Sequence, residues 1–168
     1  MNKNPEYELS KLIKKTDYKL VLAESCTGGL VSHLVTNVPG SSDYFLGSVV
    51  TYSNEAKNQI LGVKAKTLAK YGAVSKETAL EMAEYVRSFF SQIYPFDKII
   101  GASISGVAGP DGGSDEKPVG LVWIGISHKN HRSAHDFLWD GNREENKLKS
   151  AVQCLNLINC LLNKQYNI

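Results

Sequence analysis

The first candidate for chemistry is a serine at the point where a strand-like sequence pattern changes to a helical one. Residues 19–23 form a largely apolar run with the length of a buried strand, which stops at the stretch ESCTGG, residues 24–29. Apolar residues then recur at helical spacing over residues 30–38. A strand that turns into a helix leaves the first N–H groups of that helix unpaired, and these favour an anion or a developing oxyanion. Ser25 is therefore our candidate for an active-site hydroxyl.

A second small-residue loop follows another buried strand. Residues 98–104 form that strand, and in the loop at residues 105–113 four of nine residues are glycine. Glycine at this density indicates positive φ angles or a close approach of the backbone to a ligand. Ligands of open α/β sheets bind at the carboxyl ends of the strands. The two loops are therefore predicted to meet there and form one pocket.

Length and composition indicate one globular domain, which we expect to span residues 1–168. The 42% of hydrophobic and 21% of charged residues exclude disordered and fibrous classes. No apolar run approaches the roughly 18 residues that span a bilayer, and the polar residues 1–15 do not resemble a signal peptide. We expect a cytoplasmic protein without membrane partners. A net charge of +2 without a basic stripe argues against nucleic-acid binding.

The order of the expected elements predicts the fold class. It is helix, strand, helix, strand, helices, strand, hairpin and helix, with strands at residues 19–23, 45–52, 98–104, 119–127 and 132–139. We predict an α/β fold with a single layered domain. Its sheet is mixed and mostly parallel, with helices on both faces and a closing antiparallel hairpin.

Five sequence motifs, in this order, resemble the CinA C-terminal-domain family. They are AESCTGG (residues 23–29), VTYSNEAK (50–57), GAVS (72–75), SISGVAGP (103–110) and KPVG (117–120). The match is nearest to the stand-alone nicotinamide-nucleotide amidohydrolases of that family and covers the chain from about residue 17 to the final helix. It implies hydrolysis of the carboxamide of nicotinamide mononucleotide (NMN) to nicotinic acid mononucleotide and ammonia. It also implies a small phosphorylated pyridine nucleotide as the molecular partner, no cofactor, and association into a homo-oligomer.

The same resemblance implies a catalytic serine, lysine and tyrosine, which match Ser25, Lys57 and Tyr52. Amide hydrolysis needs a nucleophile, a base, a proton for the leaving ammonia and a site for the oxyanion. No histidine lies in the motifs, so a serine–lysine pair fits better than a Ser–His–Asp triad. A lysine base requires a lowered pKa, which burial or a nearby cation provides. Tyr52 could relay the proton or hold the amine.

The other candidates are expected to bind substrate. The N–H groups of the first loop are candidates for the oxyanion hole, and the second loop, with a nearby arginine, is expected to bind the phosphate. These residues are Thr27, Gly28 and Gly29, then Ser105, Gly106, Ala108, Gly109 and Arg143. Ser105 replaces a threonine of some relatives, and Asn142 stands where relatives often have an acid.

Alternative chemistry comes from a cysteine and three histidines. Cys26 lies near a helix start, where thiolates are favoured, but it has no histidine partner in any motif and ranks behind Ser25. His128, His131 and His135 straddle the hairpin turn at residues 128–131 without an acidic or cysteine partner at ligand spacing. We interpret this turn as a solvated loop and expect no bound metal.

Two other functions compete with amide hydrolysis. The first is a nucleotide-binding or regulatory module of the same fold that has lost catalysis. The second is a phosphate-ester enzyme, which we discount because the sequence has no Walker-type loop and no paired metal-binding carboxylates. Ammonia release from NMN separates the amidohydrolase from the module.

Overall fold

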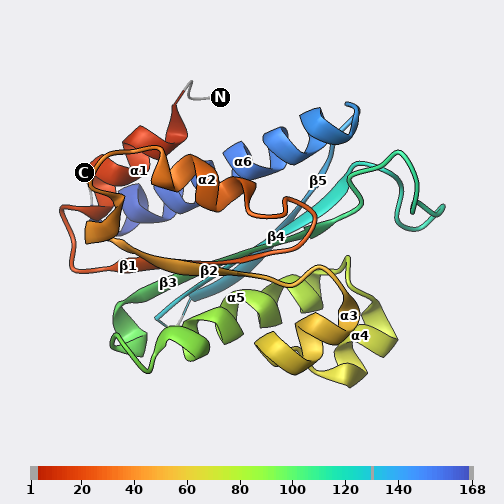
Figure 1. Ribbon diagram of the computed structural model, residues 1–168, viewed down its shortest axis with the longest axis horizontal. Helices are drawn as coiled ribbons and strands as arrows, with labels where there is room; N and C mark the ends of the chain where they lie inside the picture. Colours follow the sequence, from red (N-terminus) through yellow and green to blue (C-terminus); the bar gives the residue numbers. More distant parts are fainter. Residues whose placement is uncertain (1–3, 130, 167–168) are drawn as a thin grey trace.

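A five-stranded sheet lies between two layers of helices in the computed structural model, which describes residues 4–129 and 131–166 (Figure 1). The strands are β1 (Lys19–Glu24), β2 (Phe45–Val50), β3 (Ile99–Gly106), β4 (Leu121–His128) and β5 (His131–Leu138). The helices are α1 (Pro5–Ile13), α2 (Leu30–Thr36), α3 (Asn54–Ala56), α4 (Ala65–Tyr71), α5 (Lys76–Phe90) and α6 (Arg143–Tyr166). A π-helical turn (Lys57–Leu61) extends α3, and 3-10 turns cover Ser41–Asp43 and Phe96–Lys98. Among the described residues, no helix combines the length and apolarity that a membrane crossing demands.

The sheet order is β2-β1-β3-β4-β5. Strand β1 is parallel to both of its neighbours, whereas β3 pairs with β4, and β4 with β5, in antiparallel fashion. Only β4 therefore runs against the common strand direction. This confirms the predicted α/β class, with a mixed, mostly parallel sheet and a closing hairpin. The carboxyl ends of β1, β2 and β3 lie at one edge, where the two small-residue loops begin.

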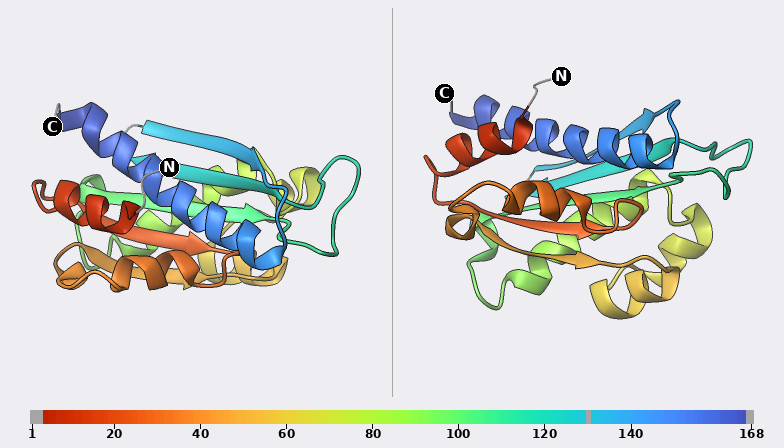
Figure 2. Two further views of the ribbon diagram at one scale, coloured as in Figure 1. Left: turned by 90° about the horizontal axis from the view of Figure 1, so that it is seen from above. Right: turned by 45° about the horizontal axis from the view of Figure 1, so that its top comes forward.

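Helices cover both faces of the sheet, as predicted. Helices α1, α2 and α6 lie on one face and α3, α4 and α5 on the other, and the turned views in Figure 2 show α6 lying diagonally across its layer. Alternation along β1 divides the core: Leu20 and Leu22 pack toward α1, α2 and α6, whereas Val21 and Ala23 pack with α5. Both faces of β1 are thus packed in apolar clusters, so the sheet is a rigid platform for the loops at its edge.

The hairpin differs from the sequence-based expectation. Strand β4 extends to His128, which pairs with His131 at the start of β5, so the ladder continues up to the turn. His128 is completely buried and its ring meets that of Tyr18 edge-to-face at 4.4 Å. The prediction of a solvated loop was therefore wrong for His128, whereas His131 and His135 are exposed. Asn130 of the expected loop lies outside the described residues, as do residues 1–3 of the polar N-terminal stretch.

Glycines of the second loop are required for two separate reasons. Gly109 and Gly112 have φ angles of 87° and 88°, a region that other residues avoid. Gly106 has no such angle, but a Cβ there would lie 2.6 Å from the Val122 side chain. The loop can therefore pass close to β4 and turn sharply, as its composition indicates.

Candidate active site

The hydroxyl of Ser25 meets the amine of Lys57 at the carboxyl edge of the sheet. Their Oγ and Nζ atoms are 2.9 Å apart, although 32 positions separate them in the chain. Ser25 directly follows β1, and its N–H donates to the Ile104 carbonyl of β3, which fixes the corner to the sheet. Lys57 is the first residue of the π-helical turn, a rare conformation that is frequent at functional sites.

The amine of Lys57 is buried and contacts three oxygen atoms of the protein. Besides Ser25 it contacts the carbonyl oxygens of Thr51 at 2.9 Å and Tyr52 at 3.4 Å. Only 1% of the residue is exposed, and in the described part of the chain no carboxylate forms an ion pair with it. Burial lowers the pKa of the Lys57 amine because the charged form loses its hydration. This is the environment that a lysine base requires.

Tyr52 connects this pair to Arg143. Its carbonyl faces the Lys57 amine, whereas its side chain is 61% exposed and its hydroxyl accepts a hydrogen bond of 2.8 Å from Arg143. Arg143 also donates to the Gly109 carbonyl at 2.7 Å. The guanidinium therefore bridges the segment after β2 and the second glycine loop. The Tyr52 hydroxyl contacts Arg143, and only the Tyr52 main chain contacts the amine.

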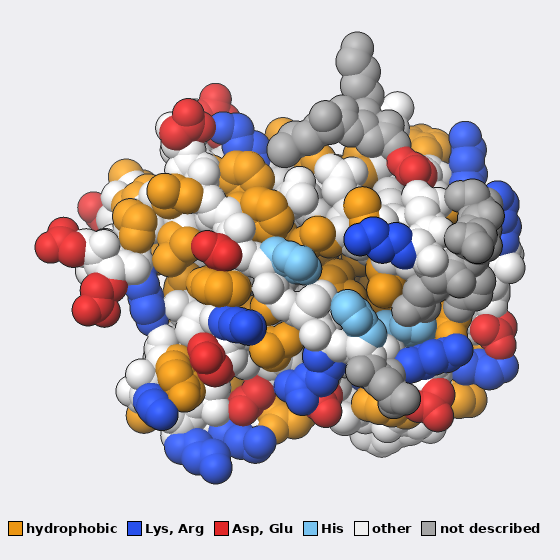
Figure 3. All heavy atoms as spheres, turned by 180° about the vertical axis from the view of Figure 1, so that it is seen from behind, with side chains coloured by type: hydrophobic (Ala, Val, Ile, Leu, Met, Phe, Trp, Pro, Cys, Tyr) orange, Lys and Arg blue, Asp and Glu red, His pale blue; other side chains and the backbone are white. Residues whose placement is uncertain are grey.

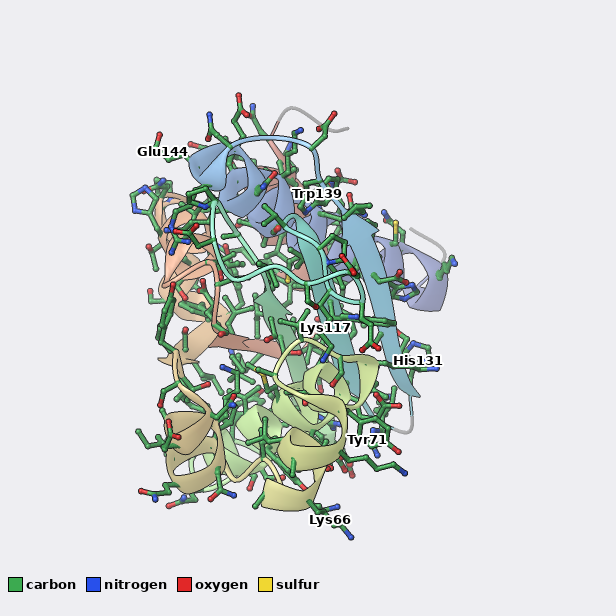
Figure 4. The ribbon with its side chains drawn as sticks, turned by 90° about the vertical axis from the view of Figure 1, so that its right-hand side faces the viewer. Lys66, Tyr71, Lys117, His131, Trp139 and Glu144 are labelled. Carbon is green, nitrogen blue, oxygen red and sulfur yellow. The ribbon has the colours of Figure 1, made fainter. Side chains whose placement is uncertain are left out.

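A cleft of about 580 Å³ opens beside Arg143, between the second loop and the start of α6. It is lined by Ala108, Gly109, Pro110, Val119, Gly141, Asn142, Arg143 and Glu144. Asn146 of α6 holds the loop in place by donating to the Ala108 carbonyl at 3.2 Å. In Figure 4, which faces this edge of the sheet, Glu144 lies near the top, Tyr71 and Lys66 lie toward the bottom, and Lys117, which follows the second loop in the chain, lies between them.

The N–H groups of the first loop are largely engaged within the protein. The amide of Gly28 donates to the Ser25 carbonyl at 3.1 Å, and the amide of Gly29 donates to the Glu24 carboxylate at 2.9 Å. The Thr27 hydroxyl also donates to Glu24, at 2.7 Å. This corrects the expectation that Gly28 and Gly29 offer free oxyanion donors. Their role is conformational, because both have positive φ angles, 63° and 99°.

The Ser105 hydroxyl is also engaged. It is buried and donates to the Ala73 carbonyl at 2.7 Å, and this hydrogen bond connects β3 to the segment before α5. This corrects its expected role as a donor to phosphate. Gly106, Ala108 and Gly109 do lie in the loop beside the cleft, with Ala108 and Gly109 in its wall.

Cys26 is poorly placed for nucleophilic chemistry. The residue is buried, and loss of hydration raises the pKa of its thiol to about 12. A thiol with that pKa is almost fully protonated near neutral pH, so it is a weak nucleophile. In the part of the chain that the structure describes, no group of three or more His, Cys, Asp or Glu side chains is placed to hold a metal.

Sequence reasoning did not assign a role to Glu24 or to the Thr51 carbonyl. Glu24 ends an otherwise apolar strand and is itself buried, so a charged residue in a core position was the available indication. No side-chain pattern could reveal Thr51, because it contributes its main chain.

Comparison with known proteins places this geometry in a family. Residues 2–162 match the family described as the CinA C-terminal domain. The chain belongs to the CinA C-terminal domain family. The putative competence-damage inducible protein of Moorella thermoacetica is 53% identical over 139 residues, which are 83% of this chain and 32% of that protein. The chain thus spans about a third of the length of such curated relatives.

Solved CinA structures share the fold over nearly the whole chain. A CinA superfamily protein from Klebsiella pneumoniae superposes with a TM-score of 0.86 at 28% identity, over 95% of this chain and 96% of that one. The competence/damage inducible protein CihA from Agrobacterium tumefaciens gives a TM-score of 0.83 at 34% identity, with coverage of 95% and 96%. None of these three names states a reaction.

Proposed function

We propose that this CinA-family chain hydrolyses the carboxamide of NMN to nicotinic acid mononucleotide and ammonia. The observation that carries the proposal is the 2.9 Å contact between Ser25 Oγ and a buried, desolvated Lys57 amine. A hydroxyl paired in this way with a lysine of lowered pKa is the arrangement of a serine–lysine acyl-transfer site.

The partners of the amine support its role as a base. Carbonyl oxygens only accept hydrogen bonds, so the carbonyls of Thr51 and Tyr52 take two N–H groups of Lys57. A neutral amine has two N–H groups and one lone pair. The charged amine donates to all three oxygens, including Ser25 Oγ, whereas a neutral amine with both N–H groups directed at the carbonyls has its lone pair left for the Ser25 hydroxyl. Burial favours this neutral form.

The proposed reaction runs in two halves. Ser25 Oγ attacks the carboxamide carbon while its proton passes to Lys57 Nζ, giving a tetrahedral oxyanion and a lysine ammonium. The C–N bond then breaks, Lys57 returns the proton to the leaving nitrogen, and ammonia departs from an acyl-enzyme. In the second half water replaces Ser25 as the nucleophile, with Lys57 again accepting and returning a proton. The products are the original hydroxyl and the carboxylic acid, which ionises to the carboxylate by releasing a proton to solvent.

The cleft beside Arg143 supports the choice of a phosphorylated substrate. The guanidinium contacts two neutral oxygens, the Tyr52 hydroxyl and the Gly109 carbonyl, so its positive charge is not neutralised by either partner. An anion in the cleft would therefore gain a charge-assisted contact. Tyr52 links the cleft to the proposed base, because its carbonyl contacts the Lys57 amine and its hydroxyl contacts Arg143.

The test is ammonia release from NMN by the purified chain without added metal, with nicotinic acid mononucleotide quantified by chromatography. The Ser25→Ala variant should release none, whereas Ser88→Ala, a substitution of an exposed serine on α5, should remain active. Binding of NMN by the wild type without ammonia release would overturn the proposal in favour of a nucleotide-binding module of the same fold.

A further inference from the structure

Glu24 is a buried carboxylate with an unusual number of partners. One oxygen accepts from the Thr27 hydroxyl at 2.7 Å and from the amides of Gly29 at 2.9 Å and Val31 at 3.2 Å. The other accepts from the amide and hydroxyl of Ser32, at 2.9 and 2.6 Å. All five contacts direct a donor at an oxygen, as an ionised carboxylate requires. Only 1% of the residue is exposed.

The partners of Glu24 surround the turn that carries Ser25. Glu24 is the last residue of β1, a central strand, so its backbone is fixed by β2 on one side and β3 on the other. Its side chain reaches forward over the turn to the first residues of α2. Both ends of the turn are thereby tied to one side chain, and Ser25 is the first residue between them.

The first amides of α2 are therefore occupied by a group of the protein itself. Unpaired amides and the helix dipole favour a negative charge at a helix start. Here Glu24 supplies that charge, so α2 is not directed at a ligand. In this corner, the amides of Cys26 and Thr27 are the ones engaged neither by Glu24 nor by a corner carbonyl.

We propose that Glu24 is a positioning residue for the Ser25 nucleophile. Its carboxylate fixes the turn between β1 and α2 so that Ser25 Oγ stays within reach of Lys57 Nζ, and it leaves the oxyanion to the amides of Cys26 and Thr27. This inference rests on the proposed amide hydrolysis. It assigns no contact with substrate to Glu24.

Glu24→Gln is the informative substitution because it keeps size and shape. A glutamine has one accepting oxygen, and its amide nitrogen would face N–H and O–H donors. The turn should therefore shift, and a misplacement of about 1 Å at a reacting group lowers turnover roughly 100-fold. We expect kcat to fall by about that factor while KM for NMN changes less than about threefold, since Glu24 does not line the cleft.

The matched control is Val35→Ala, which removes buried apolar atoms from the same helix but leaves all five contacts of Glu24 in place. It should reduce stability while kcat per folded molecule stays within about threefold of the wild type. Glu24→Asp keeps both accepting oxygens on a shorter side chain and provides a second variant if Glu24→Gln does not fold. We expect its kcat to lie between those of the wild type and a Ser25→Ala blank.

Labelling of Ser25 by a fluorophosphonate separates this inference from the proposed function, because it reports the reactivity of the hydroxyl without NMN. If the wild type labels but releases no ammonia, the proposed function fails while slow labelling of the Glu24 variants still supports positioning. Folded Glu24→Gln protein with wild-type kcat and labelling would overturn the inference. So would a loss of activity that follows only the loss of folded protein, as in Val35→Ala.

Discussion

Replacing Lys57 with methionine separates its proposed catalytic role from its effect on stability. Methionine has a similar length, so it fills the space of the lysine stem without an amine. Removal of a general base lowers turnover by about 10²- to 10⁴-fold. We therefore expect NMN hydrolysis by Lys57→Met to fall by at least about 100-fold. Because the amine does not line the cleft, KM should change little.

The stability of the same variant should depend on pH in a defined direction. Burial lowers the pKa of folded Lys57 below its ordinary value of 10.5, whereas in the unfolded chain the amine stays protonated up to that value. Between the two values the unfolded state binds more protons, so the wild type gains stability as pH rises, by at most about 1.4 kcal/mol per pH unit. Lys57→Met lacks this gain. The variant also leaves the buried Thr51 carbonyl without its Lys57 partner. This lowers the free energy of unfolding of the variant by about 1–3 kcal/mol at any pH.

The assay is urea unfolding of both proteins at several pH values from 7 to 10, followed by tryptophan fluorescence. The free energy of unfolding of the wild type should increase relative to that of Lys57→Met as pH rises. Lys66→Met, a substitution of an exposed lysine on α4 (Figure 4), is the control and should show neither the pH trend nor the loss of activity. A difference that is independent of pH, or retained turnover in Lys57→Met, would refute the assignment of a desolvated base.

Other positions give further tests. Cys26→Ser should retain kcat within about threefold, because burial raises the pKa of that thiol to about 12; a loss like that of Ser25→Ala would reverse the choice of nucleophile. Tyr52→Phe removes one acceptor of Arg143, so KM should rise several-fold with kcat little changed; a large fall in kcat alone would place the hydroxyl in the chemistry. Burial lowers the pKa of His128 from 6.5 to about 4, so between these pH values the unfolded chain binds the proton that the folded protein does not. The free energy of unfolding should therefore fall by roughly 3 kcal/mol as pH is lowered from 6.5 to 4. Urea unfolding at pH 7 and 4 should show that loss in the wild type, and His128→Phe should lack it.

The sequence predicted the elements of this fold well because their patterns are local. The apolar run of β1 is such a pattern, and the ends of short helices depend on equally local features: Ser53 and Ser75 cap α3 and α5, and Gly62 ends the π-helical turn with a φ angle of 93°. Both serine hydroxyls accept the N–H group three positions further on, from Ala56 and Thr78. Ends of strands were less accurate, because they depend on which neighbour continues the ladder. The hairpin illustrates this, since pairing continues to His128.

The candidate site was only partly predictable for a related reason. The contact between Ser25 and Lys57 depends on β1 and β2 being neighbours and on the π-helical turn, and neither is encoded in residue spacing alone. The engagement of Gly29 by Glu24 could not be predicted either. A helix start is usually capped by the residue before it, whereas here the carboxylate comes from the end of a strand.

A groove between β5 and α6 shows how exposed groups differ from an organised site. It is lined by Ile126, His131, Ser133, His135, Leu157, Cys160, Leu161 and Lys164, and Figure 3 shows histidine side chains beside hydrophobic ones on that face. The ring of His131 lies 3.3 Å from the hydroxyl of Ser133, which is two residues away on the same strand. By contrast, the polar groups around Ser25 contact one another across four separate segments.

The double role of Tyr52 has a consequence for how such chains diverge. Its carbonyl, which every amino acid carries, accepts from the Lys57 amine, whereas its exposed hydroxyl accepts from Arg143. A mutation at this position can therefore alter the molecules that are admitted while the proton acceptor keeps its surroundings. Substitutions at this one exposed position can therefore change which ligands bind without changing the contacts of the Lys57 amine.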